Sequence, residues 1–248
     1  MNFTRLLTLT FVAACCLVLP SSAVADPALF QVNNFEDGTT QGWVIGIGPF
    51  NPNPPFPPTN ITTGGPAGAG DNYLRLTSTG AGGPPPNPNS RLSVINTSPQ
   101  WTGNYLAAGV NAIRMDVINL GATDLHLRMM FEDPMFGPPT NIAFSTNPVV
   151  LAAGSGWTSI TFLIDPGNLT AGLGSVQAAL TNTTAIRLYH SPAAAGGQPV
   201  RIQGQLGVDN ITATAVPEPT TMLLLGMGLA GVGAAARKRR KARNSEEA

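Results

Sequence analysis

Hydrophobic and polar residues alternate with a period of two through much of the middle of the chain. Ile113, Met115 and Val117 are separated by polar residues, and the segment 125–131 begins with the same alternation. Successive side chains of a strand point to opposite faces, so this pattern predicts strands with one buried face. The other predicted strands are 29–35, 43–47, 73–78, 92–96, 157–164, 186–190 and 206–213. About nine strands without disulfides favour an antiparallel β-sandwich, an all-β fold.

Helical spacing is weak by comparison. Leu169, Leu173, Val176 and Leu180 are three or four residues apart, but glycines interrupt the run, so it predicts only a short connector. Three proline-rich stretches, 49–58, 84–88 and 134–139, lack the N–H donors that a ladder requires and are predicted to be loops.

The first 25 residues are typical of a secretory signal peptide. Arg5 precedes an apolar run over 6–19, and small residues at Ala23 and Ala25 come before Asp26. The run is shorter than the roughly 20 residues of a membrane span, which favours cleavage. A lipoprotein signal at Cys15 is the alternative, although the residues after Cys15 are apolar where a mature lipoprotein turns polar.

Cysteine and charge narrow the possibilities for the exported part. Cys15 and Cys16 both lie in the signal peptide, so the mature domain has no disulfide and must depend on a core. Residues 26–216 hold six arginines and ten carboxylates, a net charge of 6 − 10 = −4. Since phosphate binding needs clustered cations, nucleic acid is not an expected partner.

The C-terminal region has three consecutive parts. Pro217-Glu218-Pro219 prevents a helix from extending upstream, an apolar segment follows at 220–236, and a basic tail occupies 237–243. Seventeen helical residues at 1.5 Å each reach about 25 Å, a barely sufficient transmembrane helix. The basic tail should stay cytoplasmic, which places the preceding domain outside the inner membrane.

This arrangement resembles the PEP-CTERM sorting signal. The resemblance covers 216–248, and its motif residues are Pro217, Glu218, Pro219, Arg237, Lys238, Arg239 and Arg240. It implies a Gram-negative bacterium that makes exopolysaccharide, removal of the tail by an exosortase, and transient inner-membrane anchoring before delivery to the cell surface or biofilm matrix. A plain C-terminal anchor is the alternative, because it needs only the helix and the charges.

The intervening domain, 26–215, is similar at its two ends to the galactose-binding-like jelly roll of carbohydrate-binding modules. The matching residues are the run from Asn34 to Gly38 with Gly42-Trp43, and the run from Gly207 to Thr212. The resemblance implies that the first and last strands adjoin and that Glu36 and Asp209 are candidate ligands of a structural calcium ion, a cation that prefers oxygen donors. Asn210 replaces a common second acid, and both candidates also suit turns or strand ends. No other cofactor is predicted.

Glycan binding would need exposed aromatic faces beside polar groups. Trp43 and Trp157 begin strands and are expected in the core. The platforms that remain as candidates are Trp101, Tyr105, Tyr73 and Tyr189.

No catalytic residue is predicted. His126 and His190 lack metal-pair spacing and are expected on the sheet surface, and the G-x-S-x-G and P-loop motifs are absent. Adjacent acids such as Glu132 and Asp133 point to opposite faces of a strand. We therefore expect a noncatalytic, exported surface or matrix protein that binds exopolysaccharide. A purely structural matrix protein is the first alternative, and a secreted glycoside hydrolase is the second.

Overall fold

The computed structural model describes residues 26–45, 57–81, 90–134, 138–193 and 197–216. The signal peptide, the membrane helix and the basic tail predicted above lie outside these residues, as does most of the three proline-rich stretches. Within the described ranges, no helix is both long enough and apolar enough to cross a bilayer.

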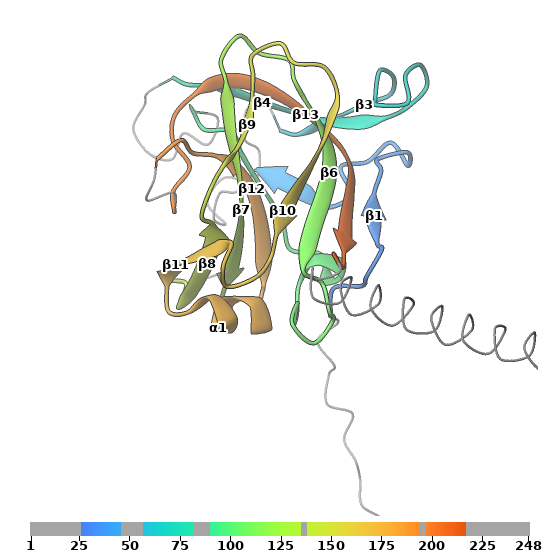
Figure 1. The fold of residues 1–248 in the computed structure, drawn as a ribbon. Helices are drawn as coiled ribbons and strands as arrows, with labels where there is room; N and C mark the ends of the chain where they lie inside the picture. The colour runs from blue at the N-terminus through green and yellow to red at the C-terminus, as the bar shows by residue number, and fades with distance from the viewer. Residues whose placement is uncertain (1–25, 46–56, 82–89, 135–137, 194–196, 217–248) are drawn as a thin grey trace, which may run out of the picture.

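Two antiparallel sheets form the domain. The first has the order β10-β6-β13-β4-β3, with β1 also paired to β13, and the second has the order β11-β8-β7-β12-β5-β2, with β9 paired to β7. Figure 1 shows the first sheet on the right and the second on the left. The strands are β1 Val32–Asn33, β2 Trp43–Ile45, β3 Thr59–Ile61, β4 Tyr73–Thr79, β5 Ser93–Asn96, β6 Ala112–Asn119, β7 Leu125–Asp133, β8 Asn141–Ser145, β9 Val149–Leu151, β10 Thr158–Leu163, β11 Leu169–Leu173, β12 Ala185–His190 and β13 Gln203–Thr214.

The period-two pattern produces the core. In β6, Ile113, Met115 and Val117 face inward and are fully buried, whereas Arg114 between them is exposed. They pack with inward residues of the second sheet, including Leu127 and Phe131, in one hydrophobic cluster. The predicted all-β antiparallel architecture is therefore confirmed.

Several element boundaries differ from the sequence prediction. The expected strand at 29–35 is reduced to β1, because Phe30 and Phe35 adopt positive φ angles of 65° and 57° that interrupt extended backbone. The connector predicted around Leu169 is half wrong: its first part is strand β11. Only α1, Val176–Thr181, is helical, with the Ser175 hydroxyl accepting from Ala178 N.

The first and last strands adjoin, as the jelly-roll resemblance implies. Val32 and Asn33 of β1 pair with Thr212 and Ile211 of β13. A register shift in β13 between Asp209 and Thr212 accompanies a positive φ at Asn210. This irregularity is a β-bulge that turns the end of the last strand.

Candidate functional site

The outer face of the second sheet carries more apolar side chains than a solvated sheet face normally does. Met130, Ile142, Phe144 and Tyr189 point away from the main core and form a second, smaller buried cluster. Met129, Met130 and Phe131 are consecutive apolar residues in β7, so both faces of this strand are covered.

An ion pair crosses the same face. Arg187 Nε of β12 lies 2.5 Å from Glu132 Oε1 of β7, and Arg187 Nη1 donates to Ser93 Oγ at 3.3 Å. Burial raises the pKa of the neighbouring Tyr189 phenol, while the charges of Arg128 and Arg187 act in the opposite direction. Tyr189 is therefore a neutral hydroxyl at any physiological pH.

Arg128 binds two chain segments to β7. Its guanidinium donates to Thr146 O at 2.7 Å, Ala193 O at 2.9 Å and Ser191 O at 3.0 Å, and also to Ser145 O. The side chain is almost fully buried, and burial lowers its pKa. Four carbonyl acceptors satisfy a charge that would otherwise be costly in this position.

Residues 191–193, which accept hydrogen bonds from Arg128, form one wall of an open groove of about 710 Å³ together with residues 197–200. Strand β11 forms the opposite wall, and Ile142 and Phe144 lie at the bottom. The other lining residues are Thr170, Ala171, Gly172, Leu173, Ser191, Ala193, Gly197, Gln198 and Val200. A Cβ on Gly172 would lie 3.2 Å from Phe144 Cε1, so this glycine leaves the floor open. The groove combines an apolar floor with hydroxyl and amide groups on its walls.

The predicted calcium ligands lie in a different place, Asp209 in β13 of the first sheet and Glu36 in the turn after β1. Glu36 Oε1 accepts from Asn72 N at 2.9 Å, and the carboxylate of Asp209 accepts from its neighbour Asn210. Burial, followed by the charges of Asp71, Asp116 and Glu36, raises the pKa of Asp209 to about 7. The charge of Glu36 thus acts on Asp209 in the folded chain. Asp71 and Asp116 are two further acids near Asp209 that the sequence did not predict.

A metal site is not complete among these acids. In the ranges that the structure describes, no three side chains of His, Cys, Asp or Glu are arranged to hold a metal ion. A cation here would need backbone carbonyls beside Glu36 and Asp209. Calcium binding stays a prediction.

Two of the aromatic platforms predicted from the sequence are wrong, because Trp101 and Tyr105 are fully buried in the main core. Trp101 Nε1 and Trp43 Nε1 both donate to Asn33 Oδ1, at 2.7 Å and 2.9 Å. Both tryptophans therefore belong to the core, whereas of these two the sequence predicted a core position for Trp43 alone.

The other two platforms are also largely covered. Tyr73 lies on the outer face of the first sheet with its ring edge against Trp157, at a centroid distance of 5.3 Å. Trp157 is half-buried there rather than in the core, and its Nε1 donates to Gly64 O at 2.9 Å. Tyr189 has no exposed surface, although it lies on the same sheet face as the groove floor.

One of the two histidines is also interior, contrary to the expectation of surface positions. His190 is buried, and its Nδ1 accepts from the His126 backbone N–H at 2.9 Å. Burial, then the charge of His126, lowers the pKa of His190 to about 4. A neutral imidazole is what this acceptor role requires.

The C-terminal sequence matches a known family of sorting signals. Residues 215–240 match the PEP-CTERM protein-sorting motif. This chain carries a sorting signal. The motif indicates an exported protein and confirms the resemblance noted at Pro217, Glu218 and Pro219. A sequence comparison with curated proteins finds no match.

Solved structures with a similar fold are distant in sequence. An exo-β-agarase is 12% identical with a TM-score of 0.51, over 78% of this chain and 25% of the agarase, so the chain spans a quarter of that enzyme. A family 11 carbohydrate-binding module from Clostridium thermocellum, solved with a β-1,3-1,4-mixed-linked tetrasaccharide, is 11% identical with a TM-score of 0.44, over 78% of this chain and 99% of the module. A cellulose-specific module of family 28 is 15% identical with a TM-score of 0.43, over 77% and 98%. The similarity to the agarase is one of fold alone.

Proposed function

We propose that this protein is an exported, noncatalytic surface or matrix protein whose β-sandwich binds an exopolysaccharide in the groove between β11 and residues 191–193 and 197–200. The groove carries the proposal. Sugar rings present apolar C–H faces and hydroxyl edges, and binding sites match them with an apolar floor and a few convergent polar groups. Phe144 and Ile142 supply the floor, and Thr170, Ser191 and Gln198 supply hydroxyl and amide groups.

The sorting signal supports the setting of this proposal. An exosortase-type enzyme would remove the tail after the inner membrane has held it, and the domain would then reach the cell surface or biofilm matrix of a Gram-negative bacterium. An open groove on a sheet face suits a long polymer better than a closed pocket does, because the chain can enter and leave at both ends.

The groove is tested by placing a charge in it. Thr170 is exposed on β11, and Thr170→Glu would place a carboxylate over the apolar floor. We expect retention in affinity gels containing mixed-linked β-glucan, agarose or the producing bacterium's own exopolysaccharide to fall about tenfold, equivalent to about 1.4 kcal/mol. Thr161→Glu, at an exposed position of β10 on the other sheet, is the matched control.

The results of that experiment separate the candidate functions. Equal retention of both variants would move binding away from the groove. If the unaltered protein is not retained on any of the polymers, the purely structural matrix role is favoured.

A hydrolase is the second alternative, and the acids around Asp209 are the observation that favours it. A carboxyl group with a pKa near 7 is suited to general acid catalysis. However, Asp209 is only 1% exposed and hydrogen-bonded to Asn210, so a polymer has no access to it. Incubating the full chain with the same polysaccharides should release no reducing ends, and any release that Asp209→Asn abolishes would establish an enzyme.

A further inference from the structure

Exposed large hydrophobic residues are concentrated at one end of the sandwich. Six of the ten in the described part of the chain lie there, and we call them the exit patch: Leu29, Phe30, Val32, Leu106, Leu163 and Val216. Phe30 is 70% exposed, and its positive φ is an uncommon conformation for a bulky residue. Clustered exposed apolar side chains are typical of a surface that contacts a protein or a membrane.

Strand register places two members of the patch in neighbouring rows of the first sheet. Leu163 of β10 pairs with Ala112 of β6, which pairs with Thr214 of β13. One row away, Val32 of β1 pairs with Thr212. Phe30 extends this surface, since its N–H donates to Ala213 O at 2.7 Å.

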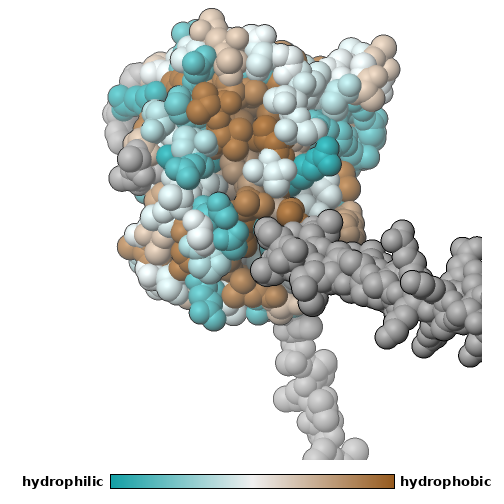
Figure 2. Space-filling view, in the orientation of Figure 1, coloured by the Kyte–Doolittle hydropathy of each residue, from teal (hydrophilic) through white to brown (hydrophobic). Residues whose placement is uncertain are grey.

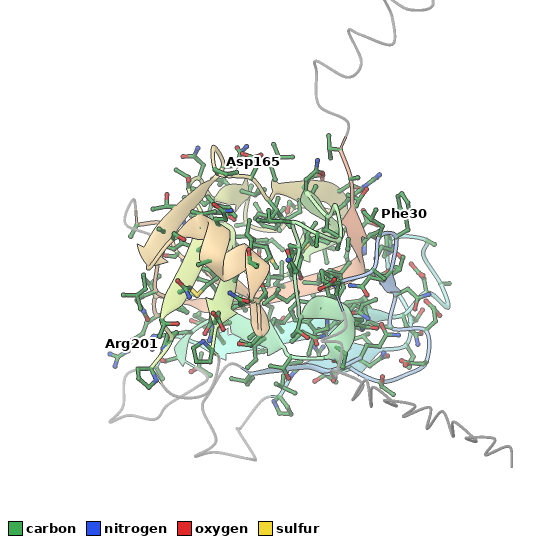
Figure 3. All side chains as sticks on the ribbon, turned by 90° about the horizontal axis from the view of Figure 1, so that it is seen from below. Phe30, Asp165 and Arg201 are labelled. Carbon is green, nitrogen blue, oxygen red and sulfur yellow. The ribbon has the colours of Figure 1, made fainter. Side chains whose placement is uncertain are left out.

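The loop 104–111 completes the same end. Asn104 N donates to Asp26 Oδ1 at 2.8 Å, while Asn111 Oδ1 accepts from Val216 N at 2.6 Å and Asn111 O accepts from Ile164 N at 2.7 Å. Leu106 in this loop therefore lies between the start of the described chain and Val216. Figure 3 looks onto this end, with Phe30 and Asp165 labelled at its rim.

The sorting motif begins at this end. Val216 is the last described residue, and only three residues separate it from Thr220, where the predicted membrane segment starts. Four Cα–Cα steps span at most about 14 Å. The headgroup layer on one side of a bilayer is about 5–7 Å thick. While the tail is held in the membrane, the exit patch must therefore lie close to the lipid surface.

We propose that the exit patch packs into the membrane interface while the sorting tail holds the chain, with Phe30, Leu106 and Leu163 at the boundary between headgroups and acyl chains. This inference rests on the proposed retention of the tail in the bilayer. Apolar side chains at an interface bury to about 5–10 Å depth. Asp26 and Asp165 flank the patch and Arg114 is the exposed cation next to it, so the contact is apolar rather than an attraction to anionic lipid.

Single-cysteine labelling tests the contact in the mature chain from Asp26 to Ala248, which lacks the apolar signal peptide and both native cysteines. One cysteine is introduced at Phe30→Cys or Leu163→Cys and labelled with the environment-sensitive dye NBD. Val150→Cys is the matched control, because Val150 is 56% exposed and pairs with His126 at the opposite end of the sandwich. Each protein is reconstituted into phosphatidylethanolamine–phosphatidylglycerol vesicles, with or without a lipid carrying a doxyl quencher.

We expect a blue shift and at least twofold quenching by the doxyl lipid at positions 30 and 163, and neither at position 150. If the chain floats with the vesicles but positions 30 and 163 are no more quenched than position 150, this inference fails and tail retention stands. If the chain does not float, both fail. A blue shift at position 30 without doxyl quenching, growing with protein density, would assign the patch to a second copy and overturn the lipid contact.

Discussion

At the scale of single residues, burial decides what each aromatic and acidic side chain does. Trp101 and Tyr105 have the aromatic rings that a sugar-binding platform needs, but these rings fill the space between the sheets. Tyr105 donates its hydroxyl to Trp101 O at 2.8 Å, so even its polar group serves the interior. A residue type is therefore a weak guide to binding unless its exposure is known.

Asp209 makes a pH-dependent contribution to stability. Its pKa is raised from 3.8 to about 7 in the folded chain, so between these values the folded state holds a proton that the unfolded state has lost. The free energy of unfolding therefore falls as pH rises from about 4 to about 7. In Asp209→Asn this contribution is absent, so we expect its stability to decline less over that range in urea titrations performed with EDTA.

The same variant reports on calcium. If Glu36 and Asp209 bind the ion, adding calcium at pH 7.5 raises the melting temperature of the unaltered chain and has little effect on Asp209→Asn. Asp124→Asn, which removes an exposed acid from the loop before β7, is the control. An equal response of all three proteins to calcium and EDTA would remove both ligand assignments.

At the scale of elements, the groove depends on how loops are fastened to strands. β11 and β8 pair from Leu169 with Ser145 to Leu173 with Ile142, which fixes one wall. Among the described residues of the other wall, the backbone N–H groups of Ser191 and Val200 donate to His126 O and His190 O, at 2.9 Å and 3.2 Å. Arg128 adds hydrogen bonds to Ser191 O and Ala193 O, so this guanidinium helps to hold the wall against β7.

Arg128→Lys tests that dependence. An ammonium group cannot reach four carbonyls arranged for a planar fork, so we expect a loss of about 2–4 kcal/mol in the free energy of unfolding. We also expect faster amide exchange at residues 191–193 and weaker retention on polysaccharide. Arg114→Lys, at an exposed position of β6, is the control and should change none of these. An unaltered exchange rate at 191–193 would show that Arg128 is dispensable for the wall.

At the scale of the whole molecule, the surface divides into regions with separate roles. The groove lies on the second sheet and the exit patch at the end near Val216. Figure 2 shows a further apolar strip on the face drawn, between the sheet edges labelled β9 and β10 in Figure 1. The groove walls and the exit patch belong to different elements, so polysaccharide binding and membrane contact are compatible in one chain.

Processing at both ends is a prediction for the complete protein. Intact mass spectrometry of the product purified from its native host should show a chain that begins at Asp26 and lacks residues 237–248, because signal peptidase and an exosortase-type enzyme remove the two ends. A product that retains the basic tail would instead favour a plain anchor. A product that begins at Met1 would contradict export through a cleaved signal.

The sequence alone determined the features that depend on local pattern. Alternation placed β6, β7, β10 and β12, because a side chain's face follows directly from its position in a strand. The sorting motif is likewise contiguous, so its residues could be identified without a fold. The short strands β3, β8, β9 and β11 were missed, because three to five residues carry too little periodicity.

Only the tertiary structure decided which side chains meet. The groove joins β8 and β11 to a segment about fifty residues from β8 in the chain, and Asp209 and the three acids around it come from four separate elements or loops. Pairing between distant strands sets these contacts, and it also sets which aromatic residues are enclosed. Exposure is a property of the packed sheets, so it could not be read from the order of residues in any single strand.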